Sequence, residues 1–415
     1  MRLLLRLARR NLFRNRRRSI LTLLAVLIPV AVLDLMWGFS GAIERSLFQN
    51  TVELETGHLQ IHRAGYRALR AGETLSLIWD VRPLLEVLSQ DSEIGWWTVR
   101  LDLPALAAAG DRSRGILIQG IEPERSKRIS LIDRWIQEGR YLQDQDLNSA
   151  VVGDALLRKL GLKVGEPILL LVSHPQIGSR VLMPKVVGEV HAPSRELRRA
   201  IVQVPLEDAR RLLNTPQAAT GVVALVSGVT GPWDSGRIEE VAHQLQERLG
   251  DEYIVETWEE LAPETVGFLK ILRPLYAGFG AIFYILSGLI VLNTLYLSVL
   301  ERIRELGVIR AVGASARRTM GMIMAESLLL ALIGALLGTA LGVGLVLWGS
   351  RGFVMPLVYE EMLANIGIQP ILHLRITALQ SLWSVIGMVI IALIAAWYPA
   401  RKAARLDPVE AMRYV

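Results

Sequence analysis

The sequence predicts a membrane protein with four transmembrane helices and a large extracytoplasmic α+β domain between the first helix and the second. Three observations predict this class. Four apolar segments are each long enough to cross a hydrocarbon core of about 30 Å, which takes about 20 helical residues. Residues 41–268 contain no such segment. Those residues carry 25 basic against 32 acidic side chains, whereas the rest of the chain carries 21 against 8.

The composition excludes several classes of protein. The chain has 415 residues, of which 52% are hydrophobic, and it has no cysteine, so disulfide frameworks and thiolate zinc sites are absent. The net charge of +6 would favour nucleic-acid binding if it covered one soluble domain. Because the positive charge instead flanks the apolar segments, it indicates membrane topology, and we expect no nucleic-acid partner.

The N-terminal region is basic and then apolar. Residues 1–19 carry eight arginines and no acidic residue, which predicts a cytoplasmic amphipathic helix at the inner surface of the lipid bilayer. Residues 20–40 form the first predicted transmembrane helix. A secretory signal peptide is the alternative, but the apolar run is longer than a signal core and no A-x-A site follows, which favours an uncleaved helix.

One ionisable residue interrupts the first apolar segment. A charged carboxylate in the middle of a bilayer is costly, so Asp34 is either an interfacial group that reaches water or a polar group facing a substrate path between helices. Its place near the outer end of the segment favours the interfacial interpretation.

Residues 41–268 are numerous enough to build a core of their own. GHLQIHR at 57–63 alternates polar and apolar residues as a half-buried strand does, with His58 and His62 on the polar face. We expect these histidines to be exposed, since the helical H-E-x-x-H zinc motif is not matched. Buried core positions are expected for Trp79, Trp96 and Trp97, with exposed ligand anchors as the alternative.

The same region predicts a mixed domain with a partly antiparallel sheet. Residues 150–172 predict a strand, a helix capped by Asp154 and ended by Gly161, a turn and a second strand. Further strands are predicted at 185–190, 200–205 and 253–256, and further helices at 206–213 and 236–249. The region has no G-x-S-x-G elbow and no nucleophile–histidine–acid set, so we expect no catalytic residue, metal or cofactor bound by this chain.

Three more transmembrane helices are predicted at 269–300, 320–348 and 376–397, with an extracytoplasmic loop at 349–375. Gly334, Gly338 and Gly342 recur every four residues in the third helix, a spacing that lets another helix approach closely. Because all the basic segments then lie on one side, both termini are predicted to be cytoplasmic.

The segment 301–319 joins the second and third transmembrane helices. It is the most distinctive stretch, with five arginines between positions 302 and 318. A charged cytoplasmic turn would explain the arginines. It would not explain why apolar residues recur among the charges at helical spacing, as in a helix that docks onto a protein. Glu326 follows in the third helix, and an arginine of this segment is its expected partner.

Two motifs carry a resemblance to a known family. ERIRELGVIRAVGAS at 301–315 and YPARKAARLDPVEAMR at 398–413 resemble the cytoplasmic coupling segment and the C-terminal motif of the MacB/LolC–LolE/FtsX group of ABC transporter permeases. The resemblance implies a multi-pass protein of the bacterial inner membrane, a second permease copy of the same or another sequence, and a cytoplasmic ATPase dimer that binds ATP and Mg²⁺. The coupling residues it implies are Glu301, Arg302, Glu305, Gly307, Arg310, Gly313, Ala314, Ser315, Pro399 and Arg401.

The chain contains no G-x-x-x-x-G-K-[ST] motif, so the ATPase is expected to be a separate polypeptide and this chain is not expected to be an enzyme. TGHLQIHRAGY at 56–66 is most similar to the LolC/LolE branch, which implies release of lipoproteins from the inner membrane with a periplasmic chaperone. The alternatives are MacB-like efflux with periplasmic adaptors, FtsX-like regulation of a cell-wall hydrolase, and a membrane-anchored receptor without an ATPase.

Overall fold

A computed structural model of the chain describes residues 16–66, 76–174, 178–192, 195–354 and 371–405. These residues form two compact units. The helical unit contains residues 16–43, 270–354 and 371–405, and the sheet unit contains the described residues of 44–269. The predicted segment 1–19 and the loop 349–375 lie largely outside the described residues.

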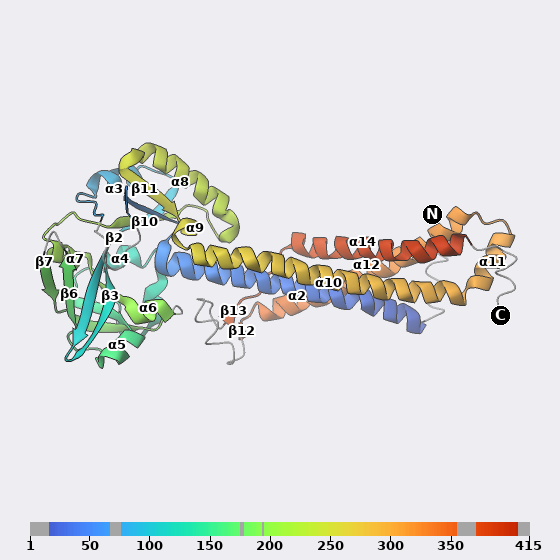
Figure 1. Ribbon diagram of the computed structural model, residues 1–415, viewed down its shortest axis with the longest axis horizontal. Helices are drawn as coiled ribbons and strands as arrows, with labels where there is room; N and C mark the ends of the chain where they lie inside the picture. Colours follow the sequence, from blue (N-terminus) through green and yellow to red (C-terminus); the bar gives the residue numbers. More distant parts are fainter. Residues whose placement is uncertain (1–15, 67–75, 175–177, 193–194, 355–370, 406–415) are drawn as a thin grey trace. The chain divides into compact units, whose positions relative to one another are not determined.

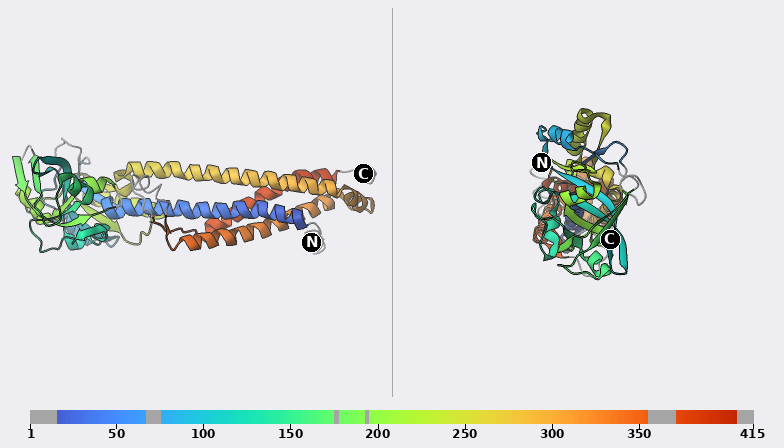
Figure 2. Two further views of the ribbon diagram at one scale, coloured as in Figure 1. Left: turned by 90° about the horizontal axis from the view of Figure 1, so that it is seen from below. Right: turned by 90° about the vertical axis from the view of Figure 1, so that its left-hand side faces the viewer.

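Four long helices and one short helix build the helical unit (Figure 1). All four long helices are long and apolar enough to cross a membrane, which confirms the predicted fold class. Figure 2 shows them running alongside one another. The bounds are α2 Arg16–Thr51, α10 Pro263–Glu301, α11 Ile303–Ala311, α12 Ala316–Gly349 and α14 Ala378–Ala404.

The helices extend beyond the apolar segments from which they were predicted. Residues 41–51 continue α2 as helix, and residues 263–268 already belong to α10. The reason is that hydropathy marks the part of a helix that contacts lipid, whereas the backbone hydrogen bonds continue until a residue that stops the helix. After α2 the chain makes one π-helical turn, η1 Val52–Thr56, and ends it at Gly57 with φ +65°.

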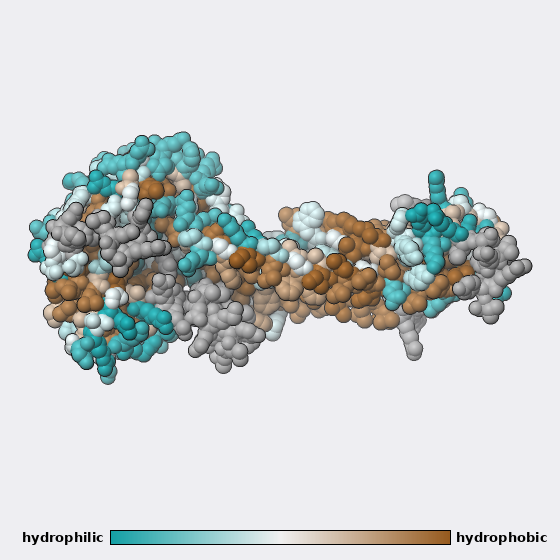
Figure 3. Space-filling model, viewed as in Figure 1, coloured by the Kyte–Doolittle hydropathy of each residue, from teal (hydrophilic) through white to brown (hydrophobic). Residues whose placement is uncertain are grey.

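Small and branched side chains from all four long helices form the core of the helical unit. Its buried members include Val26 and Val30 of α2, Val291 and Leu295 of α10, Ala331 and Ala335 of α12, and Met388, Ala392 and Ala396 of α14. Many larger apolar side chains instead point outward, as Figure 3 shows in brown along the helices. An apolar exterior is what a bilayer requires of a helical bundle.

The glycine stripe of α12 lies against α2. A Cβ atom on Gly338 would stand 2.6 Å from the carbonyl oxygen of Leu27, and one on Gly334 would stand 2.9 Å from Cβ of Val26. At Gly342 the corresponding neighbours are Cβ of Asp34 and the carbonyl oxygen of Ala31, at 2.8 and 2.9 Å. Each position of the stripe therefore brings the two backbones closer than any side chain would allow.

The sheet unit is built on an eleven-stranded mixed sheet in the order β11-β1-β10-β2-β3-β9-β5-β8-β4, with the β6–β7 hairpin paired to β2. The pairs β3–β9 and β5–β8 are parallel and the other pairs are antiparallel. The strands are β1 Leu59–Arg63, β2 Ile94–Ala109, β3 Arg112–Ile121, β4 Ile136–Gly139, β5 Ser149–Gly153, β6 Leu169–His174, β7 Gly178–Leu182, β8 Lys185–Val190, β9 Ile201–Pro205, β10 Gly221–Val226 and β11 Tyr253–Thr257.

Short helices connect these strands. They are α3 Arg82–Ser89, α4 Pro123–Ser126, α5 Asp154–Leu160, α6 Arg195–Ala200, α7 Leu206–Leu213, α8 Ser235–Leu249 and α9 Trp258–Leu261, with 3₁₀ turns at Leu131–Trp135, Pro232–Asp234 and Gly250–Glu252. The predicted strands and helices after residue 150 are confirmed within one or two residues at their ends. A small two-stranded sheet, β12 Phe353–Val354 with β13 Ile371–Leu372, belongs to the helical unit.

Asp154 has a different role from the predicted cap. Gly153 occupies the N-cap position, and the fully buried Asp154 carboxylate instead accepts hydrogen bonds from Arg158, Arg198 and His191. Burial alone would raise the pKa of Asp154, but these three hydrogen bonds together lower it below the usual range. Gly161 ends the helix in the left-handed region at φ +75°, as predicted.

The prediction that His58 and His62 are exposed is wrong. His58 and His62 are 7% and 2% exposed. The strand β1 lies between β10 and β11, so its backbone is paired on both sides. The ring of Phe48 stacks on His58, and the ring of Tyr66 stacks on His62. Alternation correctly placed the two histidines on one face, but it does not show what covers that face.

The prediction that the three tryptophans are buried in the core is not confirmed either. Trp79 and Trp96 are 46% and 48% exposed, and Trp97 is half-buried. Trp96 and Trp97 lie in the part of β2 that has a strand neighbour on one side only, because β3 ends opposite Arg100. A large side chain near the edge of a sheet stays partly in solvent whatever its hydrophobicity.

Candidate functional site

The candidate site is the compact turn that joins α10 to α12. The helix α10 ends at Glu301, Arg302 breaks it, and α11 follows as a separate short helix over Ile303–Ala311. Gly313 then adopts φ +102°, a conformation that only glycine reaches without strain. Ser315 caps α12, since its side chain accepts a hydrogen bond from the backbone nitrogen of Arg318. Residues 313–315 therefore form the corner between the helices α11 and α12.

One face of α11 is packed into the helical unit. Leu306 belongs to a small core with Val299 of α10, Ile323 of α12, and Ala400 and Ala403 of α14. Gly307, beside Leu306, is also buried. Because this core draws on four helices, a force applied to α11 acts on the ends of α10, α12 and α14 together.

The opposite face of α11 is exposed and apolar. Val308, Ile309 and Val312 are 47%, 41% and 84% exposed, and Glu305 is exposed beside them. Figure 3 shows the polar end of the helical unit in teal next to the apolar body of the bundle. Apolar side chains set among charged ones at the polar end of a bundle indicate a protein-binding surface.

A buried ion pair fixes the start of the turn. The guanidinium Nη1 of Arg302 lies 3.3 Å from Oε2 of Glu326, and the two side chains are 8% and 5% exposed. A buried ion pair fixes the relative position of its two side chains, because moving them apart would leave each charge buried without a counter-charge. The expected partner of Glu326 is thus an arginine of the turn, and it joins the break after α10 to α12.

The end of α14 completes the site. Pro399 is buried inside this helix, and Arg401 is exposed with its guanidinium 5.1 Å from the ring centre of Trp397. The ammonium of Lys402 donates a hydrogen bond of 2.7 Å to the hydroxyl of Tyr296 in α10. The final residues of the predicted C-terminal motif, 406–415, lie outside the described residues.

The predicted coupling residues divide into two groups. Arg302, Gly307 and Pro399 are buried supports. The others are exposed or half-buried: Glu301, Glu305, Arg310, Gly313, Ala314, Ser315 and Arg401. The sequence reasoning missed Lys402 and the Leu306 core. The apolar spacing of α11 shows that one face is buried, but not against which helices.

Asp34 does not reach water, so the interfacial interpretation is wrong. Its side chain is fully buried in the helical unit, beside Thr339 of α12 and Ser384 of α14. Neither carboxylate oxygen has a hydrogen-bond partner of good geometry. The closely packed stripe at Gly342 explains the burial, because it brings α12 directly over Cβ of Asp34.

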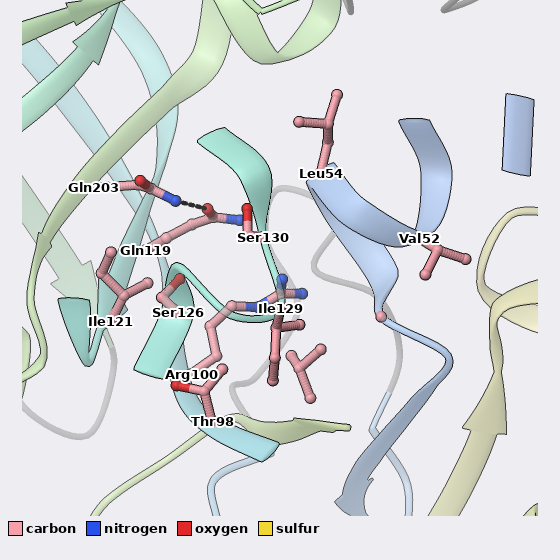
Figure 4. A pocket seen from close by; sticks show the side chains of 12 residues that line it. Val52, Leu54, Thr98, Arg100, Gln119, Ile121, Ser126, Ile129, Ser130 and Gln203 are labelled. Atoms are coloured by element: carbon pink, nitrogen blue, oxygen red, sulfur yellow. Dashed lines mark hydrogen bonds between the residues drawn. The ribbon is translucent and has the colours of Figure 1, made fainter. Parts of the chain in front are cut away.

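The sheet unit contains a small polar cavity of about 20 Å³ (Figure 4). Gln203 donates a hydrogen bond to Gln119 in its wall, and Arg100, Ser126 and Ser130 also line it. This volume suits one water molecule and no larger ligand. Within the described residues, no group of three or more histidine, cysteine, aspartate or glutamate side chains is arranged to hold a metal.

Comparisons with known proteins agree with this architecture. The family described as "MacB-like periplasmic core domain" matches residues 19–241, and the family described as "FtsX-like permease C-terminal" matches residues 277–408. The second match contains α11 and most of the turn around it.

Individual relatives and solved structures are similar to this chain at low identity. The lipoprotein-releasing system transmembrane protein LolC of Xylella fastidiosa is 25% identical over 319 residues, which cover 74% of each chain. The macrolide export ATP-binding/permease protein MacB of Bdellovibrio bacteriovorus is 28% identical over 194 residues, 44% of this chain and 27% of that protein. The extracellular domain of the transporter YknZ from Gram-positive bacteria matches 48% of this chain and 99% of that chain, with 13% identity and a TM-score of 0.34.

The two family matches account for the sheet-bearing part and the helical part of the sequence. The first alone covers more than half of the residues. Four helices that are long and apolar enough to cross a membrane, together with these family matches, indicate a multi-pass membrane protein. Members of this family work with ATPase partners in ABC transporters. The chain belongs to the MacB-like and FtsX-like family of ABC transporter permeases.

Proposed function

We propose that this chain transmits the movement of a separate cytoplasmic ATPase dimer across the membrane to its sheet unit. The observation that carries the proposal is the two-faced helix α11. Its inner face is fixed to three long helices through the Leu306 core, and its outer face presents Val308, Ile309 and Val312 to solvent. Such a helix docks into a groove of a partner and passes the partner's motion to the bundle.

The charges around α11 support this assignment. Glu305 lies among the exposed apolar residues, and Arg310 follows one turn later. Charges at the rim of an apolar contact fix the orientation of the partner more than they add affinity. ATP and Mg²⁺ would be bound by the ATPase, and this chain would supply the mechanical connection.

The arrangement of the helix ends supports a cytoplasmic location for the site. The end of α14 shares a core with α11, and both carry the basic residues that collect on the inner side of membranes. We place the protein in the bacterial inner membrane with both termini in the cytoplasm. A second permease copy, of the same or a related sequence, would complete the symmetry of an ATPase dimer.

For the cargo, we propose release of lipoproteins or other lipid-anchored molecules, as the name of the LolC relative indicates for that protein. The helical unit offers an apolar pocket of about 280 Å³ between α2 and α10, with Leu33, Trp37 and Tyr276 in its walls. Lipid chains suit an apolar pocket of this kind. A periplasmic chaperone would receive the released molecule.

MacB-like export of a peptide, antibiotic or lipid with a periplasmic adaptor is the second candidate. The match of the MacB-like core domain to residues 19–241 favours it. Reconstitution of the permease with its ATPase in proteoliposomes separates the two. ATP-dependent release of a membrane-anchored lipoprotein into solution supports the first candidate, and ATP-dependent movement of a small export substrate without lipoprotein release supports the second.

The coupling proposal is tested by purifying the tagged permease from its native membrane in mild detergent and identifying the ATPase that accompanies it. Val312→Asp places a charge on the highly exposed apolar residue that directly follows α11, and Glu305→Ala with Arg310→Ala removes charges of α11 itself. These variants should insert normally and lose the ATPase. The matched control is Arg114→Gln, which changes an exposed arginine of β3 in the sheet unit. If neither the parent nor the control retains an ATPase, a receptor without an ATPase becomes the better explanation.

A further inference from the structure

The sheet unit has an open cleft that the coupling function does not use. It has a volume of about 480 Å³ and lies between the end of α3, the start of β2 and α4. We call it the tryptophan cleft. The residues that define it are Trp96 and Trp97 of β2, Arg125 of α4, and Arg128 just after α4. Its volume is that of a pocket for a small molecule or a few side chains.

Each arginine of the cleft is stacked on one tryptophan. The guanidinium carbon of Arg128 lies 3.9 Å from a ring centre of Trp96, and that of Arg125 lies 4.2 Å from a ring centre of Trp97. Stacking holds a guanidinium group in place by one flat face and leaves its edge free to donate hydrogen bonds. Both arginines are exposed. Both guanidinium groups are therefore held at the surface of the protein by the indole rings that line the cleft.

The acidic residues around the cleft have other partners. Asp91 pairs with Arg248, Glu93 with Arg237, and Glu124 with Lys127. Among the residues that the structure describes, no carboxylate lies within ion-pair distance of Arg125 or Arg128. In a unit whose charge is negative overall, two adjacent arginines without an acidic partner mark a site for an external anion.

The backbone beside the cleft favours an extended occupant. β10 covers one side of β2 from Ile94 to Arg100, and β3 pairs with β2 only from Arg100 onward. In the described part of the chain, the other side of residues 94–99 has no neighbouring strand, and only at Val99 does a side chain, the carboxylate of Glu122, accept a hydrogen bond from the backbone nitrogen among the bonds that the structure records there. Edge strands are common docking places for extended peptides, whose side chains alternate between the surface and solvent.

From these observations we propose that the tryptophan cleft binds an extended acidic segment of a partner protein. Carboxylates of that segment would accept hydrogen bonds from Arg125 and Arg128, and apolar side chains between them would lie on the indole rings of Trp96 and Trp97. The apolar floor argues for a peptide over a simple inorganic anion, which would gain nothing from it. The inference goes beyond the proposed coupling function and does not depend on the identity of the cargo.

The test uses the full-length protein in detergent and a fluorescently labelled octapeptide of alternating glutamate and leucine. Fluorescence anisotropy should show binding that weakens as salt is raised, because charge pairs at an open surface are screened. The same peptide with glutamine in place of glutamate should bind at least about tenfold more weakly, as should Arg125→Gln/Arg128→Gln protein with the original peptide. Trp96→Leu should also weaken binding, since it removes the stacking surface.

The matched control is again Arg114→Gln, an exposed arginine whose β2 partner Ala107 lies ten residues along the strand from Trp97. It should bind the acidic peptide as the parent does. Equal affinity for the glutamate and glutamine peptides, or an unchanged affinity in the double arginine variant, would overturn the proposal. So would binding to phosphatidylglycerol vesicles that depends on the two arginines while the acidic peptide fails to bind. None of these outcomes bears on ATPase recovery, so failure here is distinguishable from failure of the coupling proposal.

Discussion

At the scale of single residues, the pair of Arg302 and Glu326 is the strongest determinant of the turn. Both side chains are nearly inaccessible to solvent. We predict that Glu326→Ala lowers the stability of the purified protein by about 3 kcal/mol, because it leaves the Arg302 guanidinium buried without a counter-charge. Thermal unfolding in detergent measures the change. Arg304→Ala, which alters an exposed arginine two residues away, is the control and should have little effect.

Variants of this pair can also distinguish a role in stability from a role in coupling to the ATPase. Replacing both residues by apolar ones, as in Arg302→Met with Glu326→Leu, removes the charges together and should restore most of the lost stability. If the double variant is as unstable as the single one, then shape rather than charge fixes the turn. ATPase recovery from the stable double variant then shows whether the ion pair is needed for coupling.

His58 gives the sheet unit a dependence on pH. Burial lowers the pKa of His58 from 6.5 to about 4. Its Nδ1 accepts a hydrogen bond of 3.0 Å from the backbone nitrogen of Val226, so protonation there would also break that bond. The unfolded chain takes up the proton near pH 6.5 and the folded chain near pH 4, so stability is complete above about pH 7 and falls between pH 6.5 and pH 4.

The expected loss between pH 8 and pH 5 is about 2 kcal/mol from this residue. His58→Gln keeps an acceptor for Val226 and removes the titration, so the variant should lose less stability over that interval. Chemical unfolding at the two pH values measures the difference. His243→Gln serves as the control because His243 is exposed on α8, and an unaltered pH dependence in His58→Gln would refute the assignment.

At this scale the sequence predicted which side chains share one face of a helix or strand, but not which other segments cover that face. It correctly proposed an arginine of the turn as the partner of Glu326, because the two positions lie at the same end of adjacent helices. It failed for Asp34, His58 and Trp96 for one physical reason. Exposure depends on which distant segment covers a face, and periodicity within a segment carries no information about that.

At the scale of elements, the close approach of α12 to α2 depends on the glycine stripe. A leucine at position 338 would place Cβ 2.6 Å from the carbonyl oxygen of Leu27, so the helices would have to separate. We predict that Gly338→Leu lowers stability by about 1–3 kcal/mol, the usual cost of overpacking. Thermal unfolding in detergent and gel filtration report the effect.

Gly344 provides the matched control in the same helix. A Cβ atom there meets nothing within 4 Å. Gly344→Leu should therefore be tolerated and should even favour the helix slightly, since glycine is a weak helix former. Equal behaviour of the two variants would show that the stripe has no role in packing and that the spacing of glycines is incidental.

The elements themselves were predicted well where local pattern determines them. The helix α7 and the strand β8 begin and end at the predicted residues. The ends of α2, α10 and α14 were predicted too short, since the hydrophobic run stops before the helical hydrogen bonds do. The order of the strands was not predicted. β1 pairs with β10 and β11, more than 150 residues away in sequence, and alternation within one strand does not encode such partners.

At the scale of the whole molecule, topology follows from charge and from length. Four apolar segments and three basic ones predict how often the chain crosses the bilayer and which ends lie together. The proposed function of the turn rests on two motifs rather than on composition. The cargo did not follow from either, because recognition of a cargo depends on surfaces assembled from distant segments, such as the pocket between α2 and α10.

The two long helices α2 and α10 each contribute residues to both units. If movement of the ATPase reaches the sheet unit along these helices, interrupting one of them should uncouple ATP hydrolysis from cargo release. We predict that insertion of Gly-Gly after Ile43, at the end of the helical unit, leaves ATPase binding intact. The same insertion should abolish ATP-dependent cargo release, because a flexible link does not transmit rotation or displacement of a helix.

The measurement compares ATPase recovery, ATP hydrolysis and cargo release in proteoliposomes for the same preparation. The control is the same insertion after Gly110, in the exposed turn between β2 and β3, which lengthens a loop without interrupting a helix. Loss of release with the first insertion and normal release with the second would support transmission through α2. Normal release with both would mean that α2 serves as an anchor, and that α10 alone connects the turn at α11 to the sheet unit.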